Sequence, residues 1–185
     1  TKNSTFQIHQ QYILTPIKNG IILIDQQAAH ERILFEKFIS ALANNQGSSQ
    51  QCLFPQTINL SAGDFELFLA IAEDLKALGF DIREFGKNTI VVHGYPSEIE
   101  NGKEEQLILG LLENFKEQAA ITKFDKKEQL AKSLARQSAI KAGTTLNPEE
   151  INQLIDELFA CELPQVGISG KASFIKLSLS DLRKL

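Results

Sequence analysis

The residues best suited to chemistry lie close together near the amino-terminal end of the sequence. The stretch IILIDQQAAHERILFEKF, residues 21–38, contains Asp25, His30, Glu31 and Glu36. Carboxylates and imidazoles bind zinc and similar ions, and such an ion can activate a water molecule for hydrolysis. The first hypothesis for this stretch is therefore one half of a metal site.

A strand that leads into a helix must position these side chains. Residues 21–24 are continuously apolar, which predicts a strand covered on both of its faces. Asp25 follows directly and is a favoured N-cap residue, so a helix is expected to begin there and to continue to about Ala43. Its apolar residues span a wide arc, which predicts that other elements pack against it on two sides.

An ordinary structural role is the alternative for each acidic side chain. Asp25 would cap the helix by accepting a hydrogen bond from its backbone. Glu31 and Glu36 would be surface carboxylates that pair with Arg32 or Lys37, and each pair would contribute roughly 0.2–0.5 kcal/mol. This interpretation needs no metal.

The residues before the strand follow a two-residue period. In TFQIHQQYILTPI, residues 5–17, four apolar residues share one parity and Gln7, His9 and Gln11 take the other, which predicts one half-buried strand. The apolar positions are Phe6, Ile8, Tyr12 and Leu14. The KNG sequence, residues 18–20, then predicts a hairpin turn into the next strand, because Asn-Gly tolerates positive φ.

Helical and strand patterns alternate along the rest of the chain, so the predicted fold class is α+β. Helices are predicted over residues 61–78, 104–118, 126–142 and 147–159, and strands over residues 52–60, 80–85, 88–95 and 172–179. Polar or charged connectors at residues 44–51 and 123–129 suggest an insertion. We therefore predict two lobes: residues 1–50 with 125–185, formed by both chain ends, and an inserted, smaller α/β lobe over residues 51–124.

Composition narrows the classes of protein that fit. Hydrophobic residues make up 43% and charged residues 23% of the 185 residues, which are ordinary globular values. The formal net charge of −4 argues against a nucleic-acid-binding surface over the whole domain, although it leaves a local basic patch open. Cys52 and Cys161 lie far apart, so neither a disulfide framework nor a cysteine-rich zinc module is expected.

The sequence also predicts a location. No apolar run is long enough to cross a membrane, and no basic, apolar leader opens the chain. A cytoplasmic protein without membrane contact is therefore expected. The first residue is Thr1 rather than Met, which suggests a fragment of a longer protein.

Five segments, in order along the chain, resemble one family. YILTPIKNGIILIDQQAAHERILFEKF resembles the C-terminal domain of the MutL family of DNA mismatch repair proteins, in which a strand ending in D-Q-H-A-x-x-E-x-x-x-x-E opens a helix. The likeness continues in LFPQTINLS, LKALGFDIREFGKNTIVVHGYP, SAIKAGTTLNPEEINQLIDELF and SFIKLSLSDL. The resemblance covers nearly the full chain. It implies a homodimerisation lobe assembled from both chain ends and a regulatory lobe from the middle.

Many members of this family carry a metal-dependent nicking endonuclease in this domain. The implied ligands are the His and first Glu of the opening motif, together with the Cys and His of a C-P-H-G-R-P segment near the carboxyl end. In this chain Asp25, Glu31 and Glu36 match the opening motif, but Gln27 stands at the histidine position. The amide of glutamine is a poor ligand for zinc.

The second half of the implied site is also altered. Gly167 and Ser169 stand at the Cys and His positions of C-P-H-G-R-P, and Arg136 replaces the Cys of an A-C-x-x-A-I segment. One of four implied ligands remains, so we expect neither a bound metal nor a catalytic residue. Substitution by His30 or Cys161 is the alternative.

A second motif is QQCLFP, residues 50–55. Gln50, Leu53 and Phe54 fit the Q-x-x-L-F arrangement that bacterial sliding clamps bind, and the resemblance places a Q-x-x-x-x-P element, ending at Pro55, in the regulatory lobe. An extended peptide that inserts Leu and Phe into a groove is a common recognition mode. The alternative is that Leu53 and Phe54 face the core.

Basic residues recur after the insertion. The candidates for contact with DNA phosphates are Lys126, Lys127, Arg136 and Lys141. The alternative is a solvated helix face balanced by acidic residues.

The sequence thus predicts the dimerisation module of a MutL-like mismatch repair protein, with no enzymatic activity of its own. The candidate interface residues are Phe6, Ile8, Tyr12 and Leu14. The resemblance implies a homodimer that works with a sliding clamp, a mismatch-recognition protein and DNA in the bacterial nucleoid. It places ATP and magnesium in a separate N-terminal domain, with no cofactor here.

Two other functions remain open at this point. A nicking endonuclease with a remodelled metal site predicts bound metal and manganese-dependent nicking. A clamp- or DNA-binding adaptor that does not dimerise predicts a monomer in solution.

Overall fold

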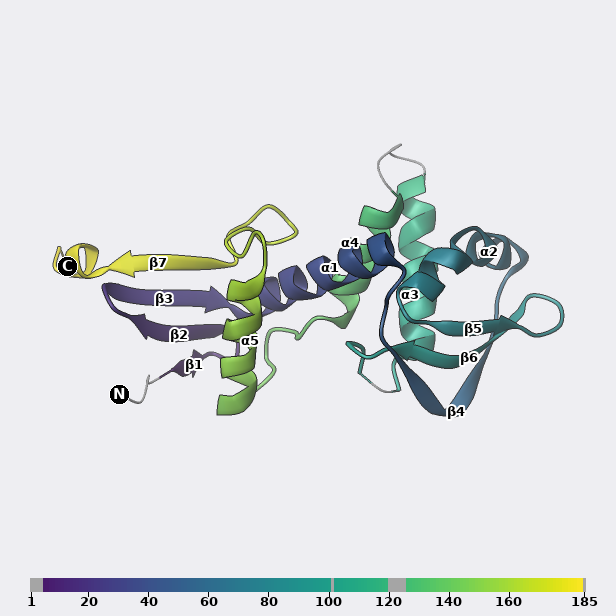
Figure 1. Ribbon diagram of the computed structural model, residues 1–185, viewed down its shortest axis with the longest axis horizontal. Coiled ribbons are helices and arrows are strands. Elements are labelled where there is room, and N and C mark those ends of the chain that lie inside the picture. Colours follow the sequence, from purple (N-terminus) through teal and green to yellow (C-terminus); the bar gives the residue numbers. More distant parts are fainter. Residues whose placement is uncertain (1–4, 101, 120–125, 185) are drawn as a thin grey trace. The chain divides into compact units, whose positions relative to one another are not determined.

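The computed structural model describes residues 5–100, 102–119 and 126–184 (Figure 1). The elements in chain order are β1 (Phe6–Ile8), β2 (Tyr12–Ile17), β3 (Gly20–Asp25), α1 (Gln26–Asn44), β4 (Ser49–Asn59), α2 (Ala62–Ala77), β5 (Asp81–Glu84), β6 (Thr89–Pro96), α3 (Glu104–Ala119), α4 (Lys126–Ser138), α5 (Pro148–Ala160), β7 (Phe174–Ser178) and α6 (Leu179–Leu182). Helices and antiparallel sheets occur together, which confirms the α+β class. Among the described residues, none of the helices combines the length and apolar character that crossing a membrane requires.

The first sheet is antiparallel and has the strand order β1-β2-β3-β7. Its outer strand β7 comes from the carboxyl end of the chain and lies beside β3, so both chain ends build one sheet (Figure 1). A hairpin turn joins β2 to β3 within residues 18–20, as predicted, but the two turn residues are Lys18 and Asn19, because Gly20 pairs with Ile17 as the first residue of β3. Cross-strand pairing is continuous from Tyr12–Asp25 to Ile17–Gly20.

The prediction of one strand over residues 5–17 is wrong. The chain reverses at residues 9–11, so that β1 and β2 form a hairpin instead. His9 and Gln10 have φ angles of 51° and 52°, a conformation that non-glycine residues rarely adopt, and the amide of Gln11 donates to the carbonyl of Ile8 at 3.1 Å. Phe6, Ile8, Tyr12 and Leu14 have the same parity on both sides of the turn, but Gln10 interrupts the apolar positions, and the polar run at residues 9–11 was the signal that the one-strand prediction missed.

One face of this sheet forms the core of its unit. Ile13 and Ile24 face each other across β2 and β3 and are fully buried. Residues of α1, α5 and the segment before α5 pack with them, and the buried cluster consists of Ile13, Ile22, Ile24, Ala29, Ile33, Leu146, Ile151, Leu154 and Leu158. Asn147 and Glu150 form the capping box that fixes the start of α5, as the Asn-Pro-Glu-Glu sequence indicates.

The second sheet is also antiparallel, with the strand order β4-β6-β5. Ile58, Ile90 and Val92 are buried on one of its faces. Because β4 is an outer strand, Pro55 does not interrupt a central ladder, and the predicted edge position is confirmed. The β4–β6 register shifts between Gln51 and Gln56, so the intervening residues bulge out of the ladder.

Helices α2 and α3 are linked by an ion pair. The Lys116 ammonium lies 2.5 Å from Asp64 Oδ1, and Ser61 accepts a hydrogen bond from the Asp64 amide at the start of α2. The hydrogen bond from Lys116 lowers the pKa of Asp64, and its contact with Asp64 raises the pKa of Lys116. Both groups are therefore held in their charged forms at neutral pH.

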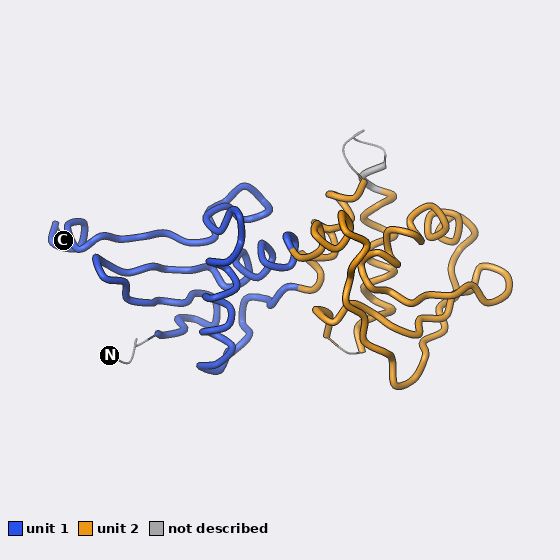
Figure 2. The backbone as a smooth tube through the Cα atoms, in the orientation of Figure 1, with its two compact units in different colours: residues 1–36, 139–185 blue, residues 37–138 orange. Residues whose placement is uncertain are grey.

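The chain divides into two compact units, residues 1–36 with 139–185 and residues 37–138 (Figure 2). The predicted lobes instead had boundaries after residues 50 and 124, and the second of these lies outside the described residues. The assignment of those lobes to dimerisation and regulation stays a prediction.

Candidate functional sites

The first turn of α1 is held by a side-chain cap. Asp25 Oδ1 accepts a hydrogen bond from the Ala28 amide at 2.9 Å, which confirms the predicted N-cap. The backbone of Asp25 also donates to the Ser173 carbonyl at 2.9 Å. Asp25 therefore ties the start of α1 to the chain just before β7.

Gln26 has a role that the sequence did not indicate. It is fully buried, and its Nε2 donates to the carbonyls of Gln10 and Thr144 at 2.8 and 3.1 Å. Its Oε1 accepts from Gln7 Nε2 at 2.6 Å, and Gln7 Oε1 accepts from the Leu146 amide. A buried amide must satisfy its polar atoms, so Gln26 fixes the β1–β2 turn and the segment before α5 against the start of α1.

The residues at the implied ligand positions of α1 are hydrogen-bonded to protein groups. Gln27 Nε2 donates to Glu31 Oε1 at 3.0 Å, and Gln27 Oε1 accepts from the Ala142 amide at 3.3 Å. His30 Nδ1 accepts from the Ile140 amide at 2.9 Å. These side chains together hold the segment that follows α4.

Arg32 and Glu36 hold the loop at residues 162–166. The Arg32 side chain is buried, and its Nε donates to the Val166 carbonyl at 2.6 Å. Glu36 accepts from the amides of Glu162 and Leu163 at 2.7 and 3.2 Å and lies 3.6 Å from the Arg32 guanidinium. We call Arg32 and Glu36 the loop clasp. The pairing of Glu36 with Arg32 was predicted, but the hydrogen bonds of Glu36 to the loop were not.

The segment at the implied C-P-H-G-R-P position forms a tight turn beside α1. The Gly167 amide donates to the Lys171 carbonyl at 2.7 Å, and a Cβ on Gly167 would lie 3.7 Å from the Ala28 methyl group. Gly167 is buried, whereas Ser169 is exposed at the turn. The fold therefore brings the altered segment to the altered helix motif.

The donor set at this place does not fit a transition metal. The turn offers a glycine and a serine, and α1 offers the Gln27 amide beside the Glu31 carboxylate. The Cys161 thiol donates to the Glu157 carbonyl at 3.5 Å. Within residues 5–100, 102–119 and 126–184, no three His, Cys, Asp or Glu side chains are grouped as a metal ion would need.

The loop clasp supports a stability prediction. Replacing Arg32 with Ala removes the donor to Val166 and the partner of Glu36, so we expect a loss of about 1–3 kcal/mol in unfolding free energy. Urea denaturation measures this loss. The exposed Lys18 gives a charge-matched control, because its replacement with Ala should change stability by less than about 0.5 kcal/mol. Equal stability of the two variants would show that the clasp contributes nothing.

The four predicted interface residues share one face of the first sheet. Phe6 pairs with Leu14 and Ile8 pairs with Tyr12, and residues directly opposite each other point to the same side. The register adds Leu23 and three further residues. We call this surface the apolar outer face, and it consists of Phe6, Ile8, Tyr12, Leu14, Ile21, Leu23, Ile175 and Leu177.

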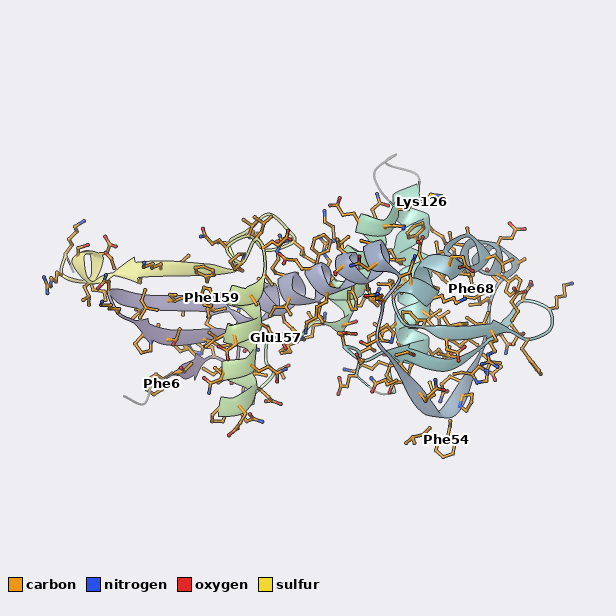
Figure 3. All side chains as sticks on the ribbon, in the orientation of Figure 1. Phe6, Phe54, Phe68, Lys126, Glu157 and Phe159 are labelled. Atoms are coloured by element: carbon orange, nitrogen blue, oxygen red, sulfur yellow. The ribbon has the colours of Figure 1, made fainter. Side chains whose placement is uncertain are left out.

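None of the eight side chains on the apolar outer face is fully covered by the chain itself. Phe6, which is labelled in Figure 3 and lies on the outer strand β1, is 58% exposed, and Ile175 is 50% exposed. The prediction that residues 21–24 are covered on both faces is thus wrong for a single chain: Ile22 and Ile24 are buried, whereas Ile21 and Leu23 are half-buried. Ile175 and Leu177 were missed, although they alternate with polar residues in the last strand.

A second apolar surface is the bulge in β4. Leu53 is 83% and Phe54 79% exposed, and Phe54 points away from the sheet (Figure 3). The alternative in which these residues face the core is therefore wrong. Gln50 Nε2 donates to the Ile99 carbonyl at 3.0 Å, which anchors the strand just before the bulge.

The basic candidates are exposed but divided between the units. Lys126, Lys127 and Arg136 lie on α4 in the second unit, and Lys141 lies in the first. Lys127 also donates to the Leu42 carbonyl at 3.5 Å. Their role toward DNA stays a prediction.

The chain is similar to proteins of one known family over most of its length. The family model described as "MutL C terminal dimerisation domain" matches residues 5–146. The protein named DNA mismatch repair protein MutL is 39% identical over 180 residues in Prosthecochloris aestuarii and 41% identical over 180 residues in Chloroherpeton thalassium. In Chlorobium limicola it is 38% identical over 185 residues.

These alignments cover 97–100% of this chain but only 28–29% of each relative, so the chain spans less than a third of the curated proteins that it matches. Because the family model matches well over half of the chain and the relatives align with nearly all of it, the chain belongs to the family of MutL C-terminal dimerisation domains.

Proposed function

We propose that this domain joins two copies of a MutL mismatch repair protein through the apolar outer face. The observation that carries the proposal is a row of apolar side chains across all four strands of the sheet, Phe6, Leu14, Leu23 and Ile175. A large exposed apolar surface marks an interaction site, and a second copy presents the same surface. The dimer would cover the second face of β3, whose unbroken apolar sequence suits a strand buried on both sides.

Dimerisation would give the longer protein its function. Two N-terminal domains, which would bind ATP and magnesium, are held at a high effective concentration by the paired C-terminal domains. They can then close around DNA and communicate with the mismatch-recognition protein. Sedimentation of the domain at micromolar concentration tests the dimer: twice the chain mass is expected, whereas a single-chain mass supports the adaptor that does not dimerise.

We also propose that the domain has no nuclease activity. The support is the replacement of three implied ligands: Gln27 binds Glu31 and the segment after α4 instead of offering an imidazole, and Gly167 and Ser169 stand at the Cys and His positions. Metal content after dialysis, measured together with manganese-dependent nicking by the full-length protein, tests this. Stoichiometric zinc or nicking that depends on Glu31 would establish the endonuclease with a remodelled site.

A third proposal is that the bulge in β4 recruits the sliding clamp. Leu53 and Phe54 are consecutive, highly exposed residues of an edge strand, with Gln50 three residues before Leu53 and Pro55 directly after Phe54. Exposed aromatic and aliphatic anchors on an extended segment suit insertion into a groove of a partner. This proposal is independent of dimerisation, since the bulge belongs to the second unit.

A further inference from the structure

A groove of about 500 Å³ lies between α2 and β5 in the second unit. Phe68 lies between these elements in Figure 3, and Phe68, Leu75 and Phe80 give the groove a buried apolar lining. The polar or partly exposed residues that line it are Ala72, Glu73, Lys76, Asp81, Ile82, Arg83 and Glu84. Because the strand order is β4-β6-β5, this groove and the bulge in β4 lie at opposite edges of the sheet.

One wall of the groove is the edge of a sheet. β5 pairs with β6 on one side, and no strand of the described chain pairs with its other side. An open edge presents backbone donors and acceptors at the spacing of a strand, which an extended polypeptide can match. Phe85, 68% exposed, follows β5 directly, and Leu69, 45% exposed, lies one helical turn before Glu73.

Charge argues against a second copy of β5 as the occupant. Two copies of Asp81–Glu84 paired antiparallel about their centre would place Asp81 of one chain opposite Glu84 of the other at both ends. Like charges directly opposite each other destabilise a strand pair. The sequence of β5 therefore disfavours pairing with itself.

The same charges favour a positively charged occupant. The groove carries three carboxylates, on Glu73, Asp81 and Glu84, against the two cations of Lys76 and Arg83. Arg83 Nε lies 3.4 Å from Asp81 Oδ1, so these two charges offset each other, which leaves the carboxylates of Glu73 and Glu84 against the single cation of Lys76.

We propose that the α2–β5 groove binds an extended, positively charged segment of a partner protein, which adds to β5 as a fourth strand of the second sheet. Side chains on one face of that segment enter the groove, apolar ones over Phe68 and Leu75 and basic ones beside Glu73 and Glu84. This interaction surface is separate from dimerisation and from the bulge in β4.

The experiment uses the purified domain and a fluorescein-labelled heptapeptide with lysine at positions 1 and 7, valine at positions 3 and 5 and threonine at the even positions, so that lysine and valine share one face. The fluorescence anisotropy of the peptide is expected to rise and saturate as the domain is added at micromolar to submillimolar concentration. Replacing Ala72 with Leu fills the groove and should weaken binding at least ~10-fold, whereas Ala70→Leu, at an exposed position of the same helix, should change it less than ~2-fold. Circular dichroism of both variants checks that the fold is retained.

Two further measurements identify the binding mode. Hydrogen exchange of the backbone amides in β5 should slow when the peptide is bound, and a peptide N-methylated at alternate residues should not bind, because it lacks the donors that a strand edge needs. The absence of saturable binding up to about 1 mM overturns the proposal. Equal binding to the Ala72→Leu variant does so too. So does equal binding of the N-methylated peptide, or of a peptide with glutamate in place of lysine. If the Ala72→Leu variant without peptide has a lower mass in solution than the unchanged domain, a second copy of the domain occupies the groove instead.

Discussion

Replacing Leu23 with Glu is expected to convert the domain from a dimer to a monomer at micromolar concentration. Leu23 lies on β3, an inner strand of the sheet, and on the apolar outer face it stands between Leu14 and Ile175 of the neighbouring strands. In a symmetric interface each substitution occurs twice, so two unpaired carboxylates would be buried together. Burying an unpaired charge costs several kcal/mol, and we expect the dissociation constant to rise at least ~100-fold.

Sedimentation velocity over a concentration series measures this change. Thr57→Glu provides the control, because Thr57 is an exposed strand residue of the second sheet and its replacement introduces the same charge. Ile175→Glu provides an independent variant from the other chain end and should also give monomers. Circular dichroism distinguishes dissociation from unfolding. If both outer-face variants remain folded dimers, the interface lies elsewhere on the domain.

The double substitution Leu53→Ala and Phe54→Ala is expected to abolish most of the binding to a bacterial sliding clamp. Both side chains are almost fully exposed, so they contribute little to the fold but are available as anchors. Truncating such anchors costs about 2 kcal/mol or more in protein interfaces, which corresponds to a loss of affinity of at least ~30-fold. The free energy of unfolding should change by less than about 0.5 kcal/mol.

Surface plasmon resonance with immobilised clamp measures the affinity, and urea denaturation measures the stability. Phe85→Ala is the matched control, since Phe85 is 68% exposed and follows β5 at the other edge of the same sheet. Its removal should leave clamp binding unchanged. Clamp binding that survives in the double variant, or that is lost equally with Phe85, would remove the bulge in β4 from the interaction.

The sequence alone determined those features that depend on local chemistry and period. The Asp25 cap, the β2–β3 hairpin and the capping box of α5 follow from short-range interactions, which residue type and spacing specify. The α+β class follows from alternating helical and strand periods. The resemblance to the MutL family was likewise available from the ordered motifs, because the opening motif and the later segments recur in sequence order.

Only the tertiary structure decided which side chains meet. The β1–β2 turn was missed because the apolar residues on its two sides share one parity, although the polar run at residues 9–11 interrupts them. The pairing of Phe6 with Leu14 placed these residues on one face with Ile175 from the far end of the chain. Burial of Gln26 and the hold of Glu36 on residues 162–163 depend on segments more than a hundred residues apart in sequence. Such contacts result from packing of the whole unit, in which a polar side chain excluded from water must find partners wherever the fold supplies them.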